Sequence, residues 1–311
     1  MILNTGNRTD IPAFYSEWFM NRVREGFALV RNPYYPGQVL RYRIDPEVVD
    51  IIAFCTKNPA PMLRDDYMEE LSRFGQFWYV TVTPYGRDIE PGVPDKDEVM
   101  ESFCRLSKYT GVKRIGWRYD PVFLSDRYDT DFHIRAFEEM AARLEGHTER
   151  VVISFIDLYE KTKKNFPEAA EVSPADRLLL GREIARAAKD HGMKVYTCLE
   201  GTDLAPFGID TGGCMTKEVL EEALGEELAV PSGTVPARSG CRCLLGSDIG
   251  AYNTCRHFCR YCYANYDRET VLKNSALHDP SSPFLTGHEM PGDEIRDAKQ
   301  VRYSTGQLRL F

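Results

Sequence analysis

Three cysteines late in the chain have the residue type and the spacing to bind a metal centre. Cys255, Cys259 and Cys262 form the pattern C-x3-C-x2-C, and an aromatic residue, Tyr261, directly precedes the third cysteine. Three thiolates on one tight loop can hold a [4Fe-4S] cluster and leave the fourth iron without a cysteine from that loop. An iron with an open position can bind a small molecule, so the spacing predicts chemistry at a cluster.

Other interpretations of this stretch stay open. Zinc also accepts thiolates, and cysteines this close in sequence also occur in disulfides. Zinc sites usually combine one C-x2-C pair with a second pair, which favours an iron-sulfur cluster here. His257 is expected to be a loop residue, with ligation of the cluster as the alternative. Asp248 is expected to accept a hydrogen bond from a loop amide, with orientation of a ligand on the open iron as the alternative.

The motif resembles the cysteine loop of the radical S-adenosylmethionine (SAM) enzymes in its spacing and its aromatic residue. In that family the amino and carboxylate groups of SAM chelate the open iron, and reductive cleavage of SAM yields a 5′-deoxyadenosyl radical. The family's loop follows the first strand of a barrel, whereas the motif here lies beyond residue 250. The resemblance implies SAM as a cofactor, a small-molecule substrate, and an electron donor such as ferredoxin or flavodoxin.

A second group of cysteines precedes the motif. Its members are Cys198, Cys214, Cys241 and Cys243. Four thiolates suffice for a second metal site, which would hold either a second [4Fe-4S] cluster or zinc. The alternative is that several of these residues are ordinary buried thiols.

Alternating strands and helices predict how these residues are positioned. Six apolar runs are expected to be strands, at residues 2–3, 51–55, 77–82, 113–117, 151–155 and 194–197. The main predicted helices cover residues 13–24, 96–110, 131–145 and 174–191, and a hairpin is predicted from the runs at 28–31 and 39–42. This order indicates an α/β fold with a parallel sheet, and the chain length favours a partial (β/α)6 TIM-like barrel.

Polar residues follow the predicted strands. Because the carboxyl ends of barrel strands meet at one mouth, we expect seven of these side chains to line it and to bind substrate or SAM. They are Arg8, Asp10, Lys57, Asn58, Arg118, Asp120 and Glu200. The alternative for each is an ordinary loop or helix-capping residue, and for the first two a surface ion pair beside a cap.

Composition limits the classes of protein that fit. The 311 residues are 43% hydrophobic, enough for one large core, and the net charge of −8 predicts no broad basic surface for nucleic acid. The N-terminus lacks a long apolar run, and no window approaches 18 uninterrupted apolar residues, so no membrane partner is expected. We predict a cytoplasmic location, where the nine cysteines are thiols or metal ligands.

The chain as a whole resembles a bacterial and archaeal family catalogued as domain of unknown function 1848. The matching stretches are residues 8–15, 56–59 and 248–252, together with the cysteine motif and residues 263–265. This resemblance implies a C-terminal cysteine cluster similar to that of radical SAM enzymes and assigns no reaction. We expect a barrel-like domain over residues 1–235 and a cysteine-rich, cluster-binding segment over residues 236–311 that packs on the mouth.

Three functions fit these observations. The leading hypothesis is an iron-sulfur enzyme of radical-SAM-like type. The second is an electron-transfer or redox-sensing protein with one or two iron-sulfur clusters and no open iron. The third is a zinc-stabilised barrel protein, in which the metal serves folding alone.

Overall fold

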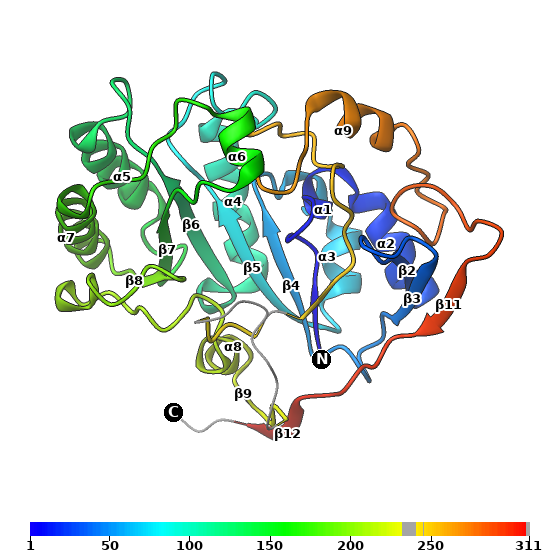
Figure 1. Ribbon diagram of the computed structural model, residues 1–311. Coiled ribbons are helices and arrows are strands. Elements are labelled where there is room, and N and C mark those ends of the chain that lie inside the picture. Colours follow the sequence, from blue (N-terminus) through cyan, green and yellow to red (C-terminus); the bar gives the residue numbers. More distant parts are fainter. Residues whose placement is uncertain (232–240, 245, 309–311) are drawn as a thin grey trace.

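The computed structural model describes residues 1–231, 241–244 and 246–308. Its centre is a seven-stranded sheet in the order β10-β1-β4-β5-β6-β7-β8, and every pairing in this sheet is parallel (Figure 1). The strands are β1 (Ile2–Asn4), β4 (Ile51–Thr56), β5 (Gly75–Thr81), β6 (Ile115–Val122), β7 (Arg150–Phe155), β8 (Lys194–Thr197) and β10 (Ser247–Asp248). The predicted mixed α/β fold with a parallel sheet is confirmed.

The sheet is open, and the barrel part of the prediction is not confirmed. Among the described residues, β8 and β10 form the two edges and do not pair with each other. The backbone of Asp210 occupies the free edge of β8. Thr197 N donates to Asp210 O at 2.9 Å, and Asp210 N donates to Val195 O at 2.9 Å. These bonds use the backbone groups that a further barrel strand would need.

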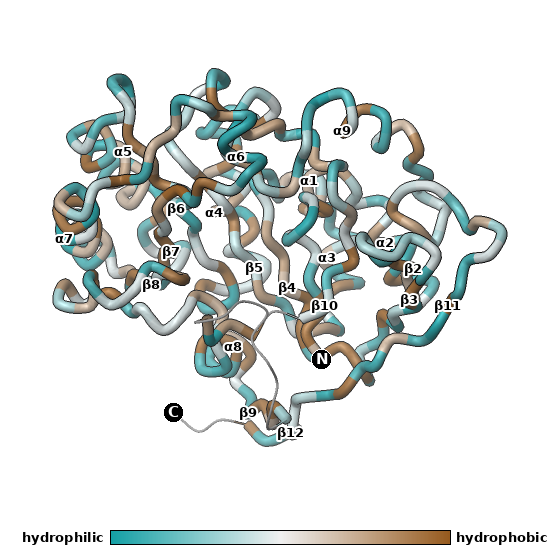
Figure 2. Tube along the Cα trace, viewed as in Figure 1, coloured by the Kyte–Doolittle hydropathy of each residue, from teal (hydrophilic) through white to brown (hydrophobic). Residues whose placement is uncertain are grey.

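Helices cover one face of the sheet and connect its strands (Figure 1). They are α1 (Ile11–Phe14), α2 (Ser16–Glu25), α3 (Asp65–Leu71), α4 (Lys96–Thr110), α5 (Thr130–Leu144) and α7 (Pro174–Asp190). Their apolar sides form the main core with alternate strand residues such as Phe54, Trp78 and Trp117. Figure 2 shows hydrophobic residues along the central strands. Burial of this face holds the strand ends in fixed positions.

Local signals explain where the helices begin and end. Ser173 caps α7 by accepting from Asp176 N, as the S-x-x-D pattern predicts. The single helix predicted over residues 13–24 is wrong, because the structure divides it into α1 and α2 at Tyr15, whose φ of −134° is not helical. The buried hydroxyl of Tyr15 donates to Thr254 O at 2.7 Å, which joins this break to the segment before the cysteine motif.

The other face of the sheet carries a second, smaller core. Strand residues Phe77, Tyr79 and Val152 pack there with all four cysteines of the second group. The short helix α8 (Lys217–Leu224) covers this face and leads into β9 (Glu226–Leu228).

Peripheral elements complete the fold. The predicted hairpin is confirmed as antiparallel β2 (Phe27–Arg31) and β3 (Gln38–Arg43), and β11 (Glu294–Asp297) pairs with β3 while β12 (Ser304–Leu308) pairs with β9. Helices α6 (Glu160–Asn165) and α9 (Arg268–Ser275) lie at the upper edge in Figure 1. Short 3-10 helices cover Ala60–Met62, Val112–Arg114 and Ala205–Phe207. The domain division at residue 235 lies outside the described residues and stays a prediction.

None of the described helices has the length and apolar character needed to cross a membrane.

Candidate functional site

The cysteine motif forms a tight loop between β10 and α9. Of its thiols, Cys259 is buried and Cys255 and Cys262 are half-buried. The loop bends at Phe258, whose φ of 55° lies in the left-handed region that few non-glycine residues adopt. Cys262 N donates to Cys259 O at 3.1 Å, and Ala264 N donates to the Cys262 sulfur at 3.3 Å. The backbone therefore fixes the curvature of the loop and stabilises charge on one sulfur.

This loop lies on the carboxyl edge of the parallel sheet. Gly92 N donates to His257 O at 2.8 Å, and Arg260 N donates to Ile89 O at 3.0 Å, which joins the loop to the segment after β5. A Cβ on Gly92 would lie 2.2 Å from Arg256 O, so the approach requires glycine. The motif therefore lies over the ends of the strands.

Asp10 and His257 connect the motif to the first helix. His257 Nε2 lies 2.8 Å from Asp10 Oδ2, and its Nδ1 lies 3.2 Å from Gly92 O, so both ring nitrogens have an acceptor. Asp10 also accepts from Ala13 N at 3.0 Å, which caps α1, and from Lys57 N at 2.7 Å. The helix-capping alternative for Asp10 is confirmed, and the choice between a loop role and a ligand role for His257 stays a prediction. Asp10 positions the motif through these bonds.

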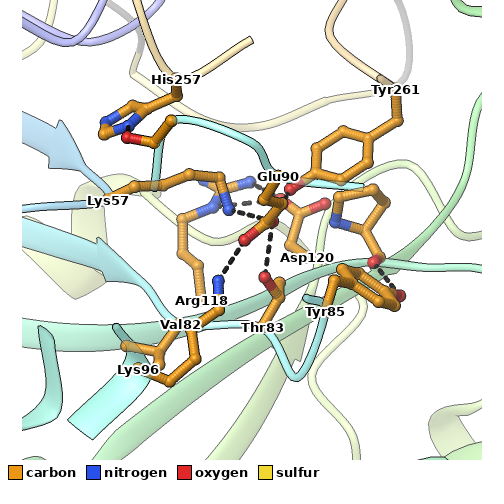
Figure 3. A network of polar contacts seen from close by, with 12 residues as sticks. Lys57, Val82, Thr83, Tyr85, Glu90, Lys96, Arg118, Asp120, His257 and Tyr261 are labelled. Carbon is orange, nitrogen blue, oxygen red and sulfur yellow. Dashed lines mark hydrogen bonds and ion pairs between the residues drawn. The ribbon is translucent and has the colours of Figure 1, made fainter. Parts of the chain in front are cut away.

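A buried carboxylate, Glu90, organises the charged groups beneath the motif (Figure 3). It accepts hydrogen bonds from Lys57 at 2.8 Å and from Thr83 at 2.7 Å, and Lys96 and Tyr261 also donate to it. Burial raises the pKa of Glu90, but the two lysines outweigh burial and lower this pKa to about 2. Glu90 is therefore ionised at neutral pH and fastens the tyrosine of the motif to the edge of the sheet.

Glu90, Lys96 and Tyr261 were not among the predicted site residues. Glu90 lies in the polar loop after the strand predicted at 77–82. The seven predicted site residues were chosen because they follow predicted strands, and the same criterion would have included Glu90. Lys96 was considered only as the start of a helix, and Tyr261 only as the aromatic residue of the motif. The contact between Glu90 and Tyr261 joins segments 171 residues apart, and residue spacing within a short stretch cannot predict such a contact.

Arg118 and Asp120 come from β6 and lie on one side of the sheet, two residues apart. Arg118 Nε lies 3.1 Å from Asp120 Oδ2, and Ser154 donates to the other carboxylate oxygen. Burial raises the pKa of Asp120, but Arg118, the Ser154 hydrogen bond and Lys57 together outweigh burial and lower this pKa. Lys57, Arg118 and Asp120 therefore form one electrostatic group, which Figure 3 shows beside Glu90.

Glu200 follows β8 and lies farther along the same edge. Its Oε1 accepts from Phe155 N at 2.9 Å, and its Oε2 lies 2.7 Å from Arg177 Nη2 of α7. Burial raises the pKa of Glu200 to about 7, although the Phe155 amide and Arg177 act in the opposite direction. A carboxyl group that titrates near neutral pH can both donate and accept a proton, which suits acid-base chemistry.

The two remaining predicted site residues make local contacts. Arg8 lies over the ring of Tyr252, 5.6 Å from its centroid, and 4.0 Å from Asp248. Asp248 accepts from two loop amides, each at 2.8 Å, which confirms its predicted role in organising this loop. Asn58 accepts from Ala60 N at 3.1 Å, as turn residues commonly do. Both contacts lie outside the Glu90 network.

The second cysteine group is compact and buried. Within the described part of the chain, Cys198, Cys241 and Cys243 are a set of potential metal ligands whose atoms all lie within 4.8 Å of one another. Cys214 adjoins this triad, because its sulfur lies 3.7 Å from the Cys243 sulfur. Hydrogen bonds from Cys198 and Cys243 hold the pKa of Cys214 well below its usual value. The triad could therefore hold a metal ion.

Comparison with known proteins gives a family and no function. No curated protein matches the chain. A family model described as "Domain of unknown function (DUF1848)" matches residues 2–264. The match includes all seven strands of the central sheet and all the cysteines of both groups. The protein therefore belongs to the family of proteins with the domain of unknown function DUF1848.

Proposed function

We propose that the protein is an iron-sulfur enzyme of radical-SAM-like type, in which Cys255, Cys259 and Cys262 hold a [4Fe-4S] cluster. One observation carries the proposal. The motif loop packs over the carboxyl edge of a parallel sheet, directly beside the charged group of Lys57 and Glu90. Ligands of parallel α/β sheets bind outside this edge. On this proposal the sheet acts as a partial barrel, and its carboxyl edge is the mouth.

The spacing and the environment of the motif thiols support a cluster. Unlike Cys198, Cys241 and Cys243, the three motif thiols are not among the described residues whose ligand atoms all lie within 4.8 Å of one another. Wider spacing is expected when each thiolate binds a different iron of a cube. Burial raises the pKa of Cys255, Cys259 and Cys262, so their thiolates need positive charge nearby. The ammonium of Lys57 favours the Cys259 thiolate, and a metal centre would supply the rest.

The loop would leave one iron of the cube without a protein thiolate. His257 does not supply the missing ligand while its ring nitrogens face Asp10 and Gly92. Such an iron supplies one-electron reduction of a bound molecule, and SAM is the ligand that the family resemblance implies. An electron donor such as ferredoxin or flavodoxin would deliver the electron.

The residues around the motif divide into two roles. Lys57, paired with Glu90, and Arg118, paired with Asp120, would orient a small-molecule substrate or SAM through their remaining N–H donors. Glu200, with its pKa of about 7, would exchange a proton with it. Asp10 and Glu90 position the loop, because their carboxylate oxygens already accept several hydrogen bonds from the protein.

Metal content and EPR spectra test this proposal. After purification without oxygen we expect about four irons and four sulfides per chain, and an EPR signal of the reduced protein that changes when SAM is added. Cys259→Ala should lose the iron. The matched control is Cys104→Ala, because Cys104 lies on α4 outside both cysteine groups. Normal iron in Cys259→Ala would refute the cluster assignment, and an unchanged EPR signal would refute SAM binding.

One observation favours an electron-transfer or redox-sensing protein as the second candidate. The groups nearest the motif bind one another, since Glu90 accepts from Lys57, Thr83, Lys96 and Tyr261 together. Such a closed network can set the potential of a redox centre without binding a substrate. This candidate predicts reversible reduction of the cluster by ferredoxin, no effect of SAM on the EPR signal, and no consumption of SAM.

A further inference from the structure

The four sulfur atoms of the second cysteine group are connected by short contacts. Cys198 Sγ lies 3.4 Å from Cys241 Sγ and 3.8 Å from Cys243 Sγ, while Cys214 Sγ lies 3.7 Å from Cys243 Sγ. All four side chains are buried in the smaller core, between 3% and 7% exposed. A single buried cysteine packs like a small apolar residue, but four thiols in mutual contact also form a possible set of metal ligands.

These three contacts have the lengths that one tetrahedral ion would produce, and Cys214, whose sulfur contacts that of Cys243, would close in on the ion from outside the triad. Zinc–sulfur bonds of about 2.3 Å place the sulfurs of a tetrahedral site about 3.8 Å apart. A cube would bind each thiolate to a different iron and hold the sulfurs farther apart. All four cysteines are free thiols in this structure. The contact between Cys198 and Cys243 joins the Cys198–Cys241 and Cys214–Cys243 pairs into one continuous cluster.

The backbone around the group is also shaped for charged sulfur. Met215 N donates to the Cys243 sulfur at 3.2 Å, and Cys243 N donates to the Cys241 sulfur at 3.3 Å. Leu244 N donates to Met215 O at 2.8 Å, which joins the two ligand-bearing turns to each other. Gly213 has a φ of 128°, and a Cβ there would lie 3.1 Å from the Cys243 sulfur. Amide donors stabilise thiolates, and the glycine leaves room for the sulfur.

We propose that Cys198, Cys214, Cys241 and Cys243 bind a single Zn²⁺ in a closed, four-thiolate structural site. Four thiolates fill the tetrahedron and leave no open position, so this zinc is structural and not catalytic. Zinc with four thiolates carries two negative charges. The guanidinium of Arg118, with Nη1 3.9 Å from the Cys214 sulfur, and the two amide donors offset part of that charge.

The position of the site explains what the zinc would hold together. Cys198 ends β8, Cys214 precedes α8, and Cys241 and Cys243 lie just before β10. One ion therefore fastens three segments, including both edges of the open sheet, to the face opposite the large helices. The radical-SAM-like reaction plays no part in this inference.

X-ray absorption at the zinc edge, on the complete protein purified without oxygen, is the deciding experiment. We expect about one zinc per chain, with a first shell of four sulfurs at about 2.3 Å and no second shell of metal atoms. Cys259→Ala should keep this zinc while it loses iron, which separates the inference from the proposed function. Cys243→Ser should lose the zinc, and Cys104→Ser, outside the group, should retain it.

Three results would overturn the inference. They are iron in place of zinc at these four sulfurs, a first shell with nitrogen or oxygen in place of one sulfur, and a disulfide between Cys198 and Cys241 in the protein alkylated before digestion. The spectrum of the unaltered protein decides the matter even if Cys243→Ser does not fold.

Discussion

The two cysteine groups differ in spacing and burial. In the compact group the sulfur contacts measure 3.4 to 3.8 Å, and the four side chains are 3% to 7% exposed. In the motif Cys255 and Cys262 are half-buried, and none of the three sulfurs belongs to the described set whose ligand atoms all lie within 4.8 Å of one another, whereas three of the four compact-group sulfurs do. Sulfurs in contact suit one ion, whereas separated sulfurs suit a cube. The comparison teaches that the distance between sulfurs, and not the number of cysteines, distinguishes the two kinds of centre.

The surroundings of the two groups differ in the same sense. Apolar side chains, among them Met215 and Leu220, pack against the compact group, whereas ionised side chains surround the motif. Arg118 lies between them, because it contacts the Cys214 sulfur at 3.9 Å and pairs with Asp120 at the mouth. Apolar packing suits a centre that stabilises the fold, and a charged surrounding suits a centre that reacts.

Removal of a compact-group ligand should have the largest effect. A structural zinc supplies on the order of 10 kcal/mol of folding free energy, which is comparable with the whole stability of a typical domain, about 5–15 kcal/mol. We expect Cys243→Ser to lose its cooperative thermal unfolding transition, measured by circular dichroism. Cys259→Ser should keep the transition and lose iron. Equal loss of the transition in both variants would remove the distinction between a structural and a reactive group.

Loss of the Glu90 carboxylate should have the next largest effect, confined to the motif side. Glu90→Gln leaves two partly buried ammonium groups without their counter-charge. Breaking a fully buried ion pair costs about 3–5 kcal/mol, and we expect a smaller loss here. Because the pKa of Glu90 is lowered from 4.5 to about 2, its stabilisation is present above pH 4.5 and is lost as the pH falls toward 2.

Urea unfolding at pH 7 and at pH 3 measures this effect. The difference in unfolding free energy between Glu90→Gln and the unaltered protein should shrink at the lower pH. Glu101→Gln, an exposed position on α4, is the matched control and should change little at either pH. A variant that also lost zinc would show that the two regions are not independent.

The sequence predicted the strands of the sheet and the metal-ligating residue types better than it predicted which distant residues come into contact. The strands at 51–55 and 151–155 were predictable because they are apolar runs, broken in the second only by Ser154. The helix at 96–110 was predictable because its apolar residues follow one face. The strand β10 was not, because two residues, Ser247–Asp248, hold no periodic signal. Its place is fixed by pairing with β1, some 240 residues away in sequence.

The candidate site shows the same limit. The spacing of Cys255, Cys259 and Cys262 predicts a metal centre because the ligands are local in sequence. The Glu90 network and the contacts among Cys198, Cys214 and Cys243 depend on how distant loops pack, so only the structure reveals them. The prediction of one continuous helix over residues 13–24 fails at Tyr15. There a tertiary hydrogen bond to Thr254 O overrides the helical pattern of the sequence.

Loss of the Asp10 charge should loosen the motif without affecting the compact group. Asp10→Asn keeps a good helix cap for α1 but removes the carboxylate that faces His257. A hydrogen bond to a charged group contributes about 1.5–3 kcal/mol. We expect faster loss of iron to a chelator, with zinc content unchanged, measured by elemental analysis over time. Iron loss at the unaltered rate would show that this link does not hold the loop.

A pair of adjacent glycines offers the finest test of the comparison. Gly213→Ala places a Cβ 3.1 Å from the Cys243 sulfur at a φ of 128°, a conformation that costs a side chain roughly 1–3 kcal/mol. Gly212→Ala is the matched control, because the atoms nearest its Cβ are the ends of the Arg242 and Asp210 side chains and not a cysteine sulfur. We expect zinc to leave Gly213→Ala several times faster than Gly212→Ala in the presence of a chelator, and iron to leave both at one rate. Equal zinc loss would mean that the compact group lacks the rigid fit that a structural site requires, since an adaptable set of thiols would absorb the added methyl group.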